Sequence, residues 1–313
     1  MLKSGSTVRH PLISLLLLLL LVFLGAFIFT LIGGAIGGFI YGLKPLFDLA
    51  SGKPGSLEFL KLIQIFSSFG MFIVSALLFA KFESNDWLAY LKLKDFSVLL
   101  FLLTILIMFS FVPILEWSNE LNKSMKLPGF LKGIEDWMLR KELEVGNLTK
   151  QLLVMNSISV LLVNLLMFVV IPAFGEELIF RGCLQKIFKR LTGNYHIAIW
   201  ITAIIFSAIH VQFYGFIPRM LLGALFGYLL VWSGSLWLPI LAHFMNNAIA
   251  VITAYIYQQK GISLDKLDQP DPVSGSVYLI SLVATSALLW FFYNQSLKQQ
   301  SVIVKGQDGA GLG

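Results

Sequence analysis

No charged residue occurs between Pro11 and Leu43, and similar apolar stretches recur along the rest of the chain. A helix of about 20 apolar residues crosses the hydrocarbon core of a bilayer, so each stretch is long enough to span a membrane. Only 13% of the 313 residues are charged, whereas soluble domains carry roughly 25%. Such a chain lacks the polar surface of a water-soluble globule. The sequence therefore predicts an all-α, polytopic transmembrane bundle.

About eight spans are expected, separated by segments that contain charges, glycine or proline. The expected spans are 11–43, 62–80, 96–115, 152–171, 195–211, 217–232, 236–257 and 273–293. Pro113 suits the end of the third span or a kink in it. The segment 173–190 is helical in content, and either continues the fourth span through a kink at Pro172 or forms a separate helix.

The segment 116–150 mixes acids and bases. Within it Phe130, Ile134 and Trp137 recur at helical spacing, which predicts an amphipathic helix at the membrane interface over 129–145. This helix serves either as a plain connection or as a lid. We therefore expect three regions in the chain. Residues 1–150 hold the N-terminal spans and the amphipathic helix, residues 151–260 form the catalytic core, and residues 261–313 hold the last span and a polar tail.

The distribution of charge predicts a topology. Eight spans place both termini on one side of the membrane, together with ten basic residues. These are Lys3, Arg9, Lys81, Lys92, Lys94, Lys186, Lys189, Arg190, Lys298 and Lys305, whereas Asp265, Asp268 and Asp271 fall on the other side. By the positive-inside rule both termini are cytoplasmic, in what we expect to be a bacterial inner membrane. The net charge of +6 is thus a topology signal and predicts no nucleic-acid partner.

Glu176 and Glu177 are the only acidic residues between Gln151 and Leu264. Burying a carboxylate in such apolar surroundings costs several kcal/mol, so an intramembrane pair of glutamates is a candidate functional site. The same window holds His196, His210 and His243. Of these, His196 lies beside a turn and outside any motif, and we interpret it as a core residue.

Helical spacing brings some of these groups together. Glu176 lies 17 residues before Gly193 and His210 lies 17 residues after it. At 1.5 Å per residue both stand roughly 25 Å from that turn, at the same level of a helical hairpin. His243 and Asn247 are spaced i, i+4 and project from one helix face, whereas Asn246 is rotated by about 100° from it.

The two glutamates are expected to differ in role. Glu177 and Arg181 form an i, i+4 pair with the acid first, the favourable order, so the two charges neutralise each other. Glu176 then has no cation on its own helix, and His210 is its expected partner. Cys183, the only cysteine, is interpreted as a packing residue.

Three motifs in order, Glu176-Glu177-x-x-x-Arg181, Phe206-x-x-x-His210 and His243-x-x-x-Asn247, resemble the CAAX-processing and bacteriocin-processing (CPBP, or Abi) intramembrane proteases, which include the type II CAAX prenyl endopeptidases. The resemblance covers about 155–257. It implies that Glu176 and His210 activate a water that attacks a peptide bond, and that His243 and Asn247 hold the oxyanion. By the same resemblance Glu177 and Arg181 carry over as structural positions and Phe206 as packing.

The function expected is hydrolysis of a peptide bond near the cytoplasmic leaflet or at mid-membrane. The expected partners are the bilayer and a membrane-associated, prenylated or peptide-precursor substrate. Two alternatives stay open. Glu176, His210 and His243 could ligate Zn²⁺ with an open position for water, although no His-Glu-x-x-His signature is present and we favour a mechanism without a cofactor. The chain could instead be a secondary transporter or a non-catalytic scaffold, because buried carboxylates and histidines also form proton relays.

Overall fold

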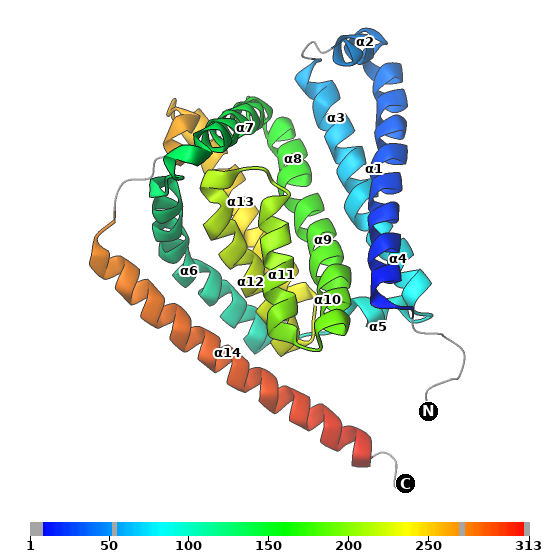
Figure 1. The fold of residues 1–313 in the computed structure, drawn as a ribbon, viewed down its shortest axis with the longest axis vertical. Helices are drawn as coiled ribbons and strands as arrows, with labels where there is room; N and C mark the ends of the chain where they lie inside the picture. The colour runs from blue at the N-terminus through cyan, green and yellow to red at the C-terminus, as the bar shows by residue number, and fades with distance from the viewer. Residues whose placement is uncertain (1–8, 52–54, 269–272, 310–313) are drawn as a thin grey trace.

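A computed structural model describes residues 9–51, 55–268 and 273–309, with the side chains of residue 268 and of 300–309 left out. The described residues form helices and no strand (Figure 1). The α-helices are α1 (Pro11–Tyr41), α2 (Lys44–Ala50), α3 (Leu57–Ser68), α4 (Ser75–Glu83), α5 (Trp87–Leu91), α6 (Val98–Ser124), α7 (Lys132–Leu152), α8 (Ile158–Leu165), α9 (Ile171–Glu177), α10 (Gln185–Thr192), α11 (Tyr195–Ala208), α12 (Phe216–Ser233), α13 (Trp237–Gln259) and α14 (Gly275–Gly309). Short 3-10 turns are η2 (Gly129–Leu131), η5 (Phe213–Gly215) and η6 (Leu264–Asp268), and π-helical segments are η1 (Phe69–Val74), η3 (Leu166–Val170) and η4 (Leu178–Leu184).

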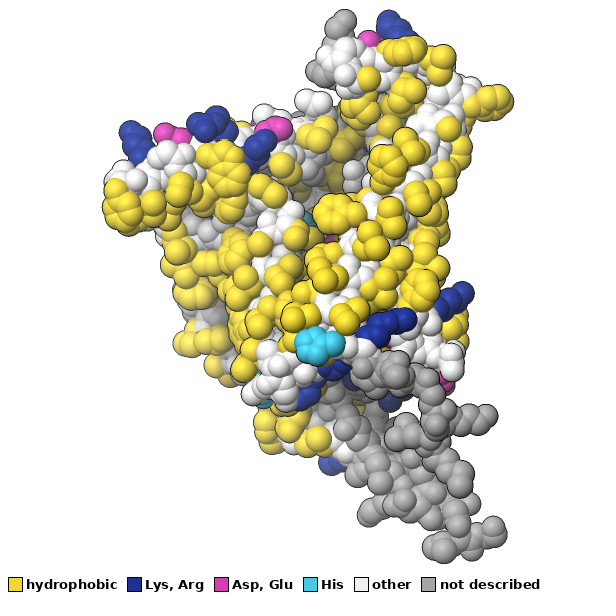
Figure 2. Space-filling view, turned by 45° about the vertical axis from the view of Figure 1, so that its right-hand side comes forward, with side chains coloured by type: hydrophobic (Ala, Val, Ile, Leu, Met, Phe, Trp, Pro, Cys, Tyr) yellow, Lys and Arg dark blue, Asp and Glu magenta, His cyan; other side chains and the backbone are white. Residues whose placement is uncertain are grey.

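Among the described residues, seven helices are long and apolar enough to cross a membrane. They are Pro11–Tyr41, Leu57–Glu83, Val98–Ser124, Ile158–Thr192, Phe213–Ser233, Trp237–Gln259 and Gly275–Gln299. An eighth apolar helix, α11, has 14 residues. The predicted all-α polytopic bundle is confirmed, and the protein is an integral membrane protein. On the face that Figure 2 shows, apolar side chains form a broad band, with charged side chains gathered above and below it.

The motif segment continues the fourth span instead of forming a separate helix. Residues 158–192 run as one rod in which η3 and η4 interrupt the regular turns. Pro172 lies in this rod and has no N–H to donate to the carbonyl four residues earlier, that of Phe168. The wider π turn of η3 directly precedes the proline and lets the helix continue past it, a device often found at functional sites. Pro113 likewise lies inside α6, which runs on to Ser124 instead of ending near residue 115.

Small residues bring α1 close to the rod formed by α3, η1 and α4. A Cβ added to Gly37 would stand 2.6 Å from the ring of Phe59, and one added to Gly25 would stand 2.3 Å from the carbonyl oxygen of Gly70. The two backbones can approach this closely only because glycine has no side chain. Small residues are common for this reason at contacts between helices in membranes. The glycines of α1 therefore allow it to pack closely against α3 and η1.

The two ends of the bundle differ. At the end that holds the first residues of α1, Glu83 accepts hydrogen bonds from Arg190 at 2.9 Å and from Ser14 at 2.9 Å, and Arg9 contacts it at 3.4 Å. The helix α7 lies across the opposite end (Figure 1). There Lys150 donates to Asp265 at 2.7 Å, which lowers the pKa of that exposed carboxyl. Of the charges assigned to sides from the sequence, Lys3 and Asp271 lie outside the described residues, as do the side chains of Asp268 and Lys305.

Candidate functional site

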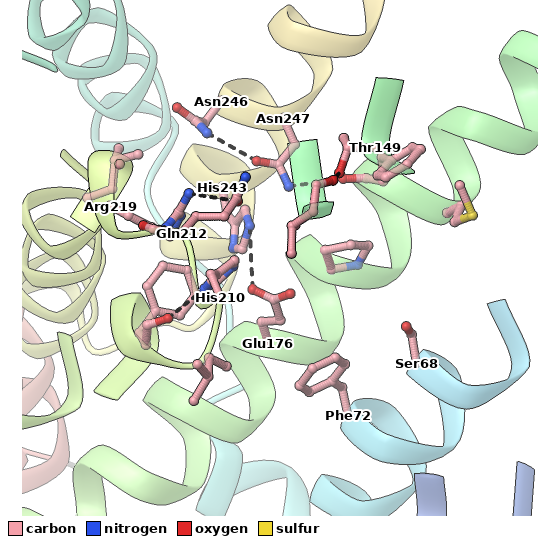
Figure 3. Close-up of a pocket in the computed structure, with 18 of the residues that line it drawn as sticks. Ser68, Phe72, Thr149, Glu176, His210, Gln212, Arg219, His243, Asn246 and Asn247 are labelled. Atoms are coloured by element: carbon pink, nitrogen blue, oxygen red, sulfur yellow. Dashed lines mark hydrogen bonds and ion pairs between the residues drawn. The ribbon is translucent and has the colours of Figure 1, made fainter. Parts of the chain in front are cut away.

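A cavity of about 710 Å³ opens inside the bundle, at the half nearer to α7. Its wall is formed by α3 and η1, by the second half of α7, by η3 and α9, and by α12 and α13. The polar groups that line it include Ser68, Thr149, Glu176, His210, Gln212, Arg219, His243, Asn246 and Asn247 (Figure 3). In the space-filling view, the apolar surface is hollowed between two columns of helices (Figure 2). Most of the sequence-predicted residues therefore face one space.

The ion pair between Glu177 and Arg181 forms the buried base of this site. Nη1 of Arg181 lies 2.6 Å from Oε1 of Glu177, and both side chains are fully buried. Nη2 of Arg181 donates to the carbonyl oxygen of Gly223 at 2.9 Å. The guanidinium carbon stands 4.6 Å from the ring centre of Phe206 and 5.2 Å from that of Phe226, so two aromatic faces also stabilise the cation. The i, i+4 ion pair expected from the sequence is present, and Phe206 contributes more than packing.

Glu177 also holds His243. The distance from Nδ1 of His243 to Oε1 of Glu177 is 2.9 Å. A carboxylate can only accept, so Nδ1–H is the donor and the other ring nitrogen, Nε2, is directed elsewhere. The ring of Phe226 stacks on the imidazole with centroids 5.4 Å apart. The carboxylate of Glu177 and the stacked ring of Phe226 thus fix the position of His243. The sequence did not indicate this contact of Glu177.

Glu176 faces His243 instead of its expected partner. Nε2 of His243 lies 4.0 Å from Oε2 of Glu176, whose side chain is 12% exposed and lines the cavity (Figure 3). No ion pair between Glu176 and His210 is formed among the described residues. The sequence paired them by counting helix levels, but α11 ends at Ala208 and leaves His210 in the following turn. Both side chains still line the same cavity.

His210 is oriented by its own turn. Its Nδ1 lies 2.7 Å from the carbonyl oxygen of Phe206, which can only accept, so Nδ1–H donates and Nε2 is left for another partner. The next residue, Val211, has a φ of +53°. This left-handed conformation is usual for glycine at a helix C-terminus and rare for a β-branched side chain. Backbone strain is therefore stored directly beside His210, as it often is at functional sites.

Asn247 is anchored to the carbonyl that Pro172 leaves without its helical donor. Nδ2 of Asn247 donates to the carbonyl oxygen of Phe168 at 3.0 Å, and Oδ1 of Asn247 accepts from Nδ2 of Asn246 at 3.1 Å. One N–H of the Asn247 amide is thus committed, and a second remains for the cavity. Asn246, expected from its helical angle to lie off this face, also lines the cavity and supports Asn247.

Two cavity residues were missed by the sequence reasoning. Arg219 and Gln212 lie side by side on the cavity wall (Figure 3). The signal was present, because Arg219 is the only Lys or Arg between residues 191 and 259. An isolated cation in an apolar stretch is a functional candidate by the reasoning used for Glu176. His196, interpreted as a core residue, is exposed at the start of α11 and contacts the hydroxyl of Tyr228 at 2.8 Å.

The zinc alternative depends on how the possible ligands are arranged. No group of three or more His, Cys, Asp or Glu side chains in the described ranges is arranged so that it could hold a metal ion. Glu176 and His243 are neighbours, but the Nδ1 of His210 is committed to its own helix end. Nε2 of His210 is the ring nitrogen that is left for a ligand.

Comparison with known proteins gives the region a family. Residues 158–249 match the model of a family described as type II CAAX prenyl endopeptidase Rce1-like, which confirms the resemblance drawn from the three motifs. The chain is similar to the uncharacterized protein YpbD of Bacillus subtilis (strain 168), with 35% identity over 81 residues. That alignment covers 25% of this chain and 38% of YpbD. No solved structure matches the chain.

Proposed function

From the match of residues 158–249 to the Rce1-like type II CAAX prenyl endopeptidases, we propose that this protein is an intramembrane endopeptidase. The observation that carries the proposal is a carboxylate, Glu176, that faces His243 across 4.0 Å inside an apolar bundle, in a cavity that His210 and Asn247 also line. A carboxylate without a counter-ion costs free energy in such apolar surroundings, so its presence indicates a function. Hydrolysis of an amide is such a function, because the carboxylate can act as the general base.

The proposed reaction begins with a water held by Glu176 and His210. Glu176 accepts a proton as the water oxygen attacks the carbonyl carbon of the scissile bond. The carbonyl π bond opens and an oxyanion forms. When the C–N bond breaks, the proton passes from Glu176 to the leaving nitrogen, so that a carboxylic acid and an amine result. A carboxylate in hydrogen-bonding reach of the water is the geometry that such general base catalysis needs.

The oxyanion is proposed to be held by His243 and Asn247. A protonated His243 donates from Nδ1 to Glu177 and presents a second N–H at Nε2, on the cavity side. The buried carboxylate of Glu177 stabilises that imidazolium and fixes its direction, as the aspartate does in a Ser-His-Asp triad. The remaining N–H of Asn247 supplies the second donor. Donors that are oriented before the reaction lower the barrier most, because they need no reorganisation when the negative charge develops.

The substrate class is proposed from the cavity and its surroundings. Residues of α3, η1, η3 and α9 line one part of the cavity, and many of them, such as Met71, Phe72 and Pro172, are apolar. A lipid-modified or apolar peptide segment suits such walls better than a soluble, charged peptide does. We therefore propose a membrane-associated protein or peptide, such as a prenylated C-terminus or a peptide precursor.

The orientation is proposed from the charge distribution. With both termini in the cytoplasm of a bacterial inner membrane, the cavity mouth beside α7 faces the non-cytoplasmic side. Of the two levels of cleavage expected from the sequence, the cytoplasmic leaflet and mid-membrane, this orientation favours mid-membrane. The 14 residues of α11 span about 21 Å, less than the roughly 30 Å hydrocarbon core, so its end near His210 lies within the apolar layer.

The test of the function is a comparison of membrane-protein fragments in cells with the wild-type protein and with Glu176→Gln. Fragments that depend on Glu176 identify substrates, and purified enzyme must then cleave them in liposomes. If no fragment differs and no tested peptide is cleaved, the proposed activity is wrong. Proton flux in the same liposomes would then identify a transporter.

A further inference from the structure

Arg219 is a cation in the wall of the candidate active site, without a carboxylate of its own. Its Nη1 donates to the backbone oxygen of Gln212 at 3.3 Å and its Nη2 to the side-chain oxygen of Gln212 at 3.1 Å. Within the described part of the chain, no Asp or Glu oxygen lies within ion-pairing distance of it. Arg181, the other arginine of this region, is fully buried, and its guanidinium is bound by Glu177 and by the carbonyl oxygen of Gly223. The two arginines therefore differ in availability to a ligand.

The carboxylates that act on Arg219 electrostatically are those of Glu142 and Glu176. Glu142 lines a neighbouring cavity of about 500 Å³ and accepts a hydrogen bond from the backbone N–H of Tyr214 at 3.2 Å. Gln212 lies between the two cavities and lines both. Glu176 is assigned to the reaction. Neither glutamate forms a contact that would saturate the five N–H donors of the guanidinium.

The surroundings of Arg219 also favour an anion. Arg219 lies in the first turn of α12, and Gly215 and Pro218 beside it line the cavity. A Cβ on Gly215 would stand 3.1 Å from Nη2 of Arg219, so the absence of a side chain there leaves room for the guanidinium. The N-terminal end of a helix carries partial positive charge, which adds to that of the arginine.

The place of Arg219 relative to the reaction follows from α12. Gly223, whose carbonyl oxygen accepts from Arg181, lies four residues further along this helix. The Cα of Arg219 is therefore displaced by about 6 Å along the helix axis from that of Gly223, which contacts Arg181. An extended peptide advances about 3.3 Å per residue, so this displacement corresponds to about two residues of substrate.

We propose that Arg219 binds the free C-terminal carboxylate of the substrate, and so decides which peptide bond reaches Glu176. This inference rests on the proposed peptidase function and adds a specificity-determining residue to it. A bidentate contact between guanidinium and carboxylate supplies direction as well as charge. The enzyme then acts on chain ends that enter the cavity, and a short C-terminal fragment is released.

The first experiment measures binding without turnover. The full-length Glu176→Gln protein in nanodiscs is titrated with a fluorescent S-farnesylated Cys-a-a-X peptide that ends in a free carboxylate, and with the same peptide ending in an amide. We expect the carboxylate peptide to bind about 10- to 100-fold more tightly, as for a hydrogen bond to a charged group. Adding Arg219→Gln should bring the ratio of the two Kd values close to 1. Arg219→Lys keeps the charge without the fork and should give an intermediate ratio.

The matched control is Lys150→Gln, which removes a cation from the wall of the neighbouring cavity and should keep the preference. The second experiment measures kcat/KM for both peptides with active enzyme. Arg219→Gln should reduce the ratio of carboxylate to amide through KM. Equal binding of the two peptides by the Glu176→Gln protein, or an equal loss for both on Arg219→Gln, would overturn the role of Arg219. If the preference is present in binding but no peptide is cleaved, the peptidase function fails while the carboxylate site stands.

Discussion

Nδ1 of His243 lies 2.9 Å from Oε1 of Glu177, the same oxygen that receives Nη1 of Arg181 at 2.6 Å. One carboxylate thus joins the arginine of the first motif to the histidine of the third. A charge placed in this way decides the tautomer and the direction of the imidazole, and it leaves Nε2 for the cavity. The Glu177–Arg181 pair is therefore a support for the reactive groups as well as a neutral buried unit.

Glu176→Gln is expected to remove the general base and leave the fold intact. Glu176 lines a cavity, and among the described residues its one ion-pair contact is that at 4.0 Å to His243. The cleavage rate of a substrate peptide should fall by about 10²- to 10⁴-fold, the usual contribution of such a base. The unfolding temperature in detergent should stay near that of the wild type. Glu144→Gln, at an exposed glutamate on α7, is the control and should cleave normally. Wild-type turnover by Glu176→Gln would refute the assigned role.

Glu177→Gln is expected to destabilise the protein, because it leaves Arg181 buried without its counter-ion. Breaking one partner of a buried pair costs about 3–5 kcal/mol in free energy of unfolding, whereas the exposed pair Lys141–Glu144 should contribute less than about 1 kcal/mol. The double variant with Arg181→Met should recover part of the loss. Denaturant titrations in mixed micelles provide the measurement. A single variant as stable as the wild type would show that the pair is not needed for folding.

Val211→Gly should be more stable than Val211→Ala. Both remove the isopropyl group, but only glycine adopts the φ of +53° without strain. The expected difference in free energy of unfolding is about 1 kcal/mol in favour of glycine, although glycine is usually the less stable choice of the two. The turn that holds His210 is also loosened, so we expect a lower kcat for Val211→Gly than for Val211→Ala. If the alanine variant is the more stable, Val211 is not strained.

The orientation predicts which loops are reachable from outside the cell. In a Cys183→Ala background, Lys260→Cys at the end of α13 should react with a membrane-impermeant maleimide on intact cells. Asp95→Cys, in the loop before α6, should react only after the cells are opened. Both side chains are exposed, so reactivity reports the side of the membrane. The reverse pattern would place the cavity mouth in the cytoplasm and move cleavage to that side.

Removal of metal is expected to leave activity in place. Because the described His, Cys, Asp and Glu side chains do not gather around a common point, incubation with a strong chelator should not lower the rate of peptide cleavage. Elemental analysis of the purified protein provides an independent readout. Loss of activity that zinc alone restores would contradict the glutamate mechanism and assign zinc to Glu176 and the histidines.

Part of this site could be predicted because helical geometry is regular. The i, i+4 spacing was sufficient for the Glu177–Arg181 pair and for the shared face of His243 and Asn247. Counting residues along the helix did not give the partner of His210, because α11 ends at Ala208. The rise per residue of a helix therefore does not apply at His210. Helical spacing also failed for Asn246, since a wide cavity receives side chains from more than one face of α13.

By itself, the sequence determined that this chain is a helical membrane protein, because apolar runs of about twenty residues leave few other solutions. It also singled out Glu176 and Glu177 as the candidate site, because they form a lone acidic pair in apolar surroundings. Only the tertiary structure decided that His243 is the neighbour of both glutamates, that Phe168 anchors Asn247, and that Arg219 faces the cavity. Those relationships depend on π turns, helix ends and packing between segments far apart in the chain. No spacing within one helix encodes them.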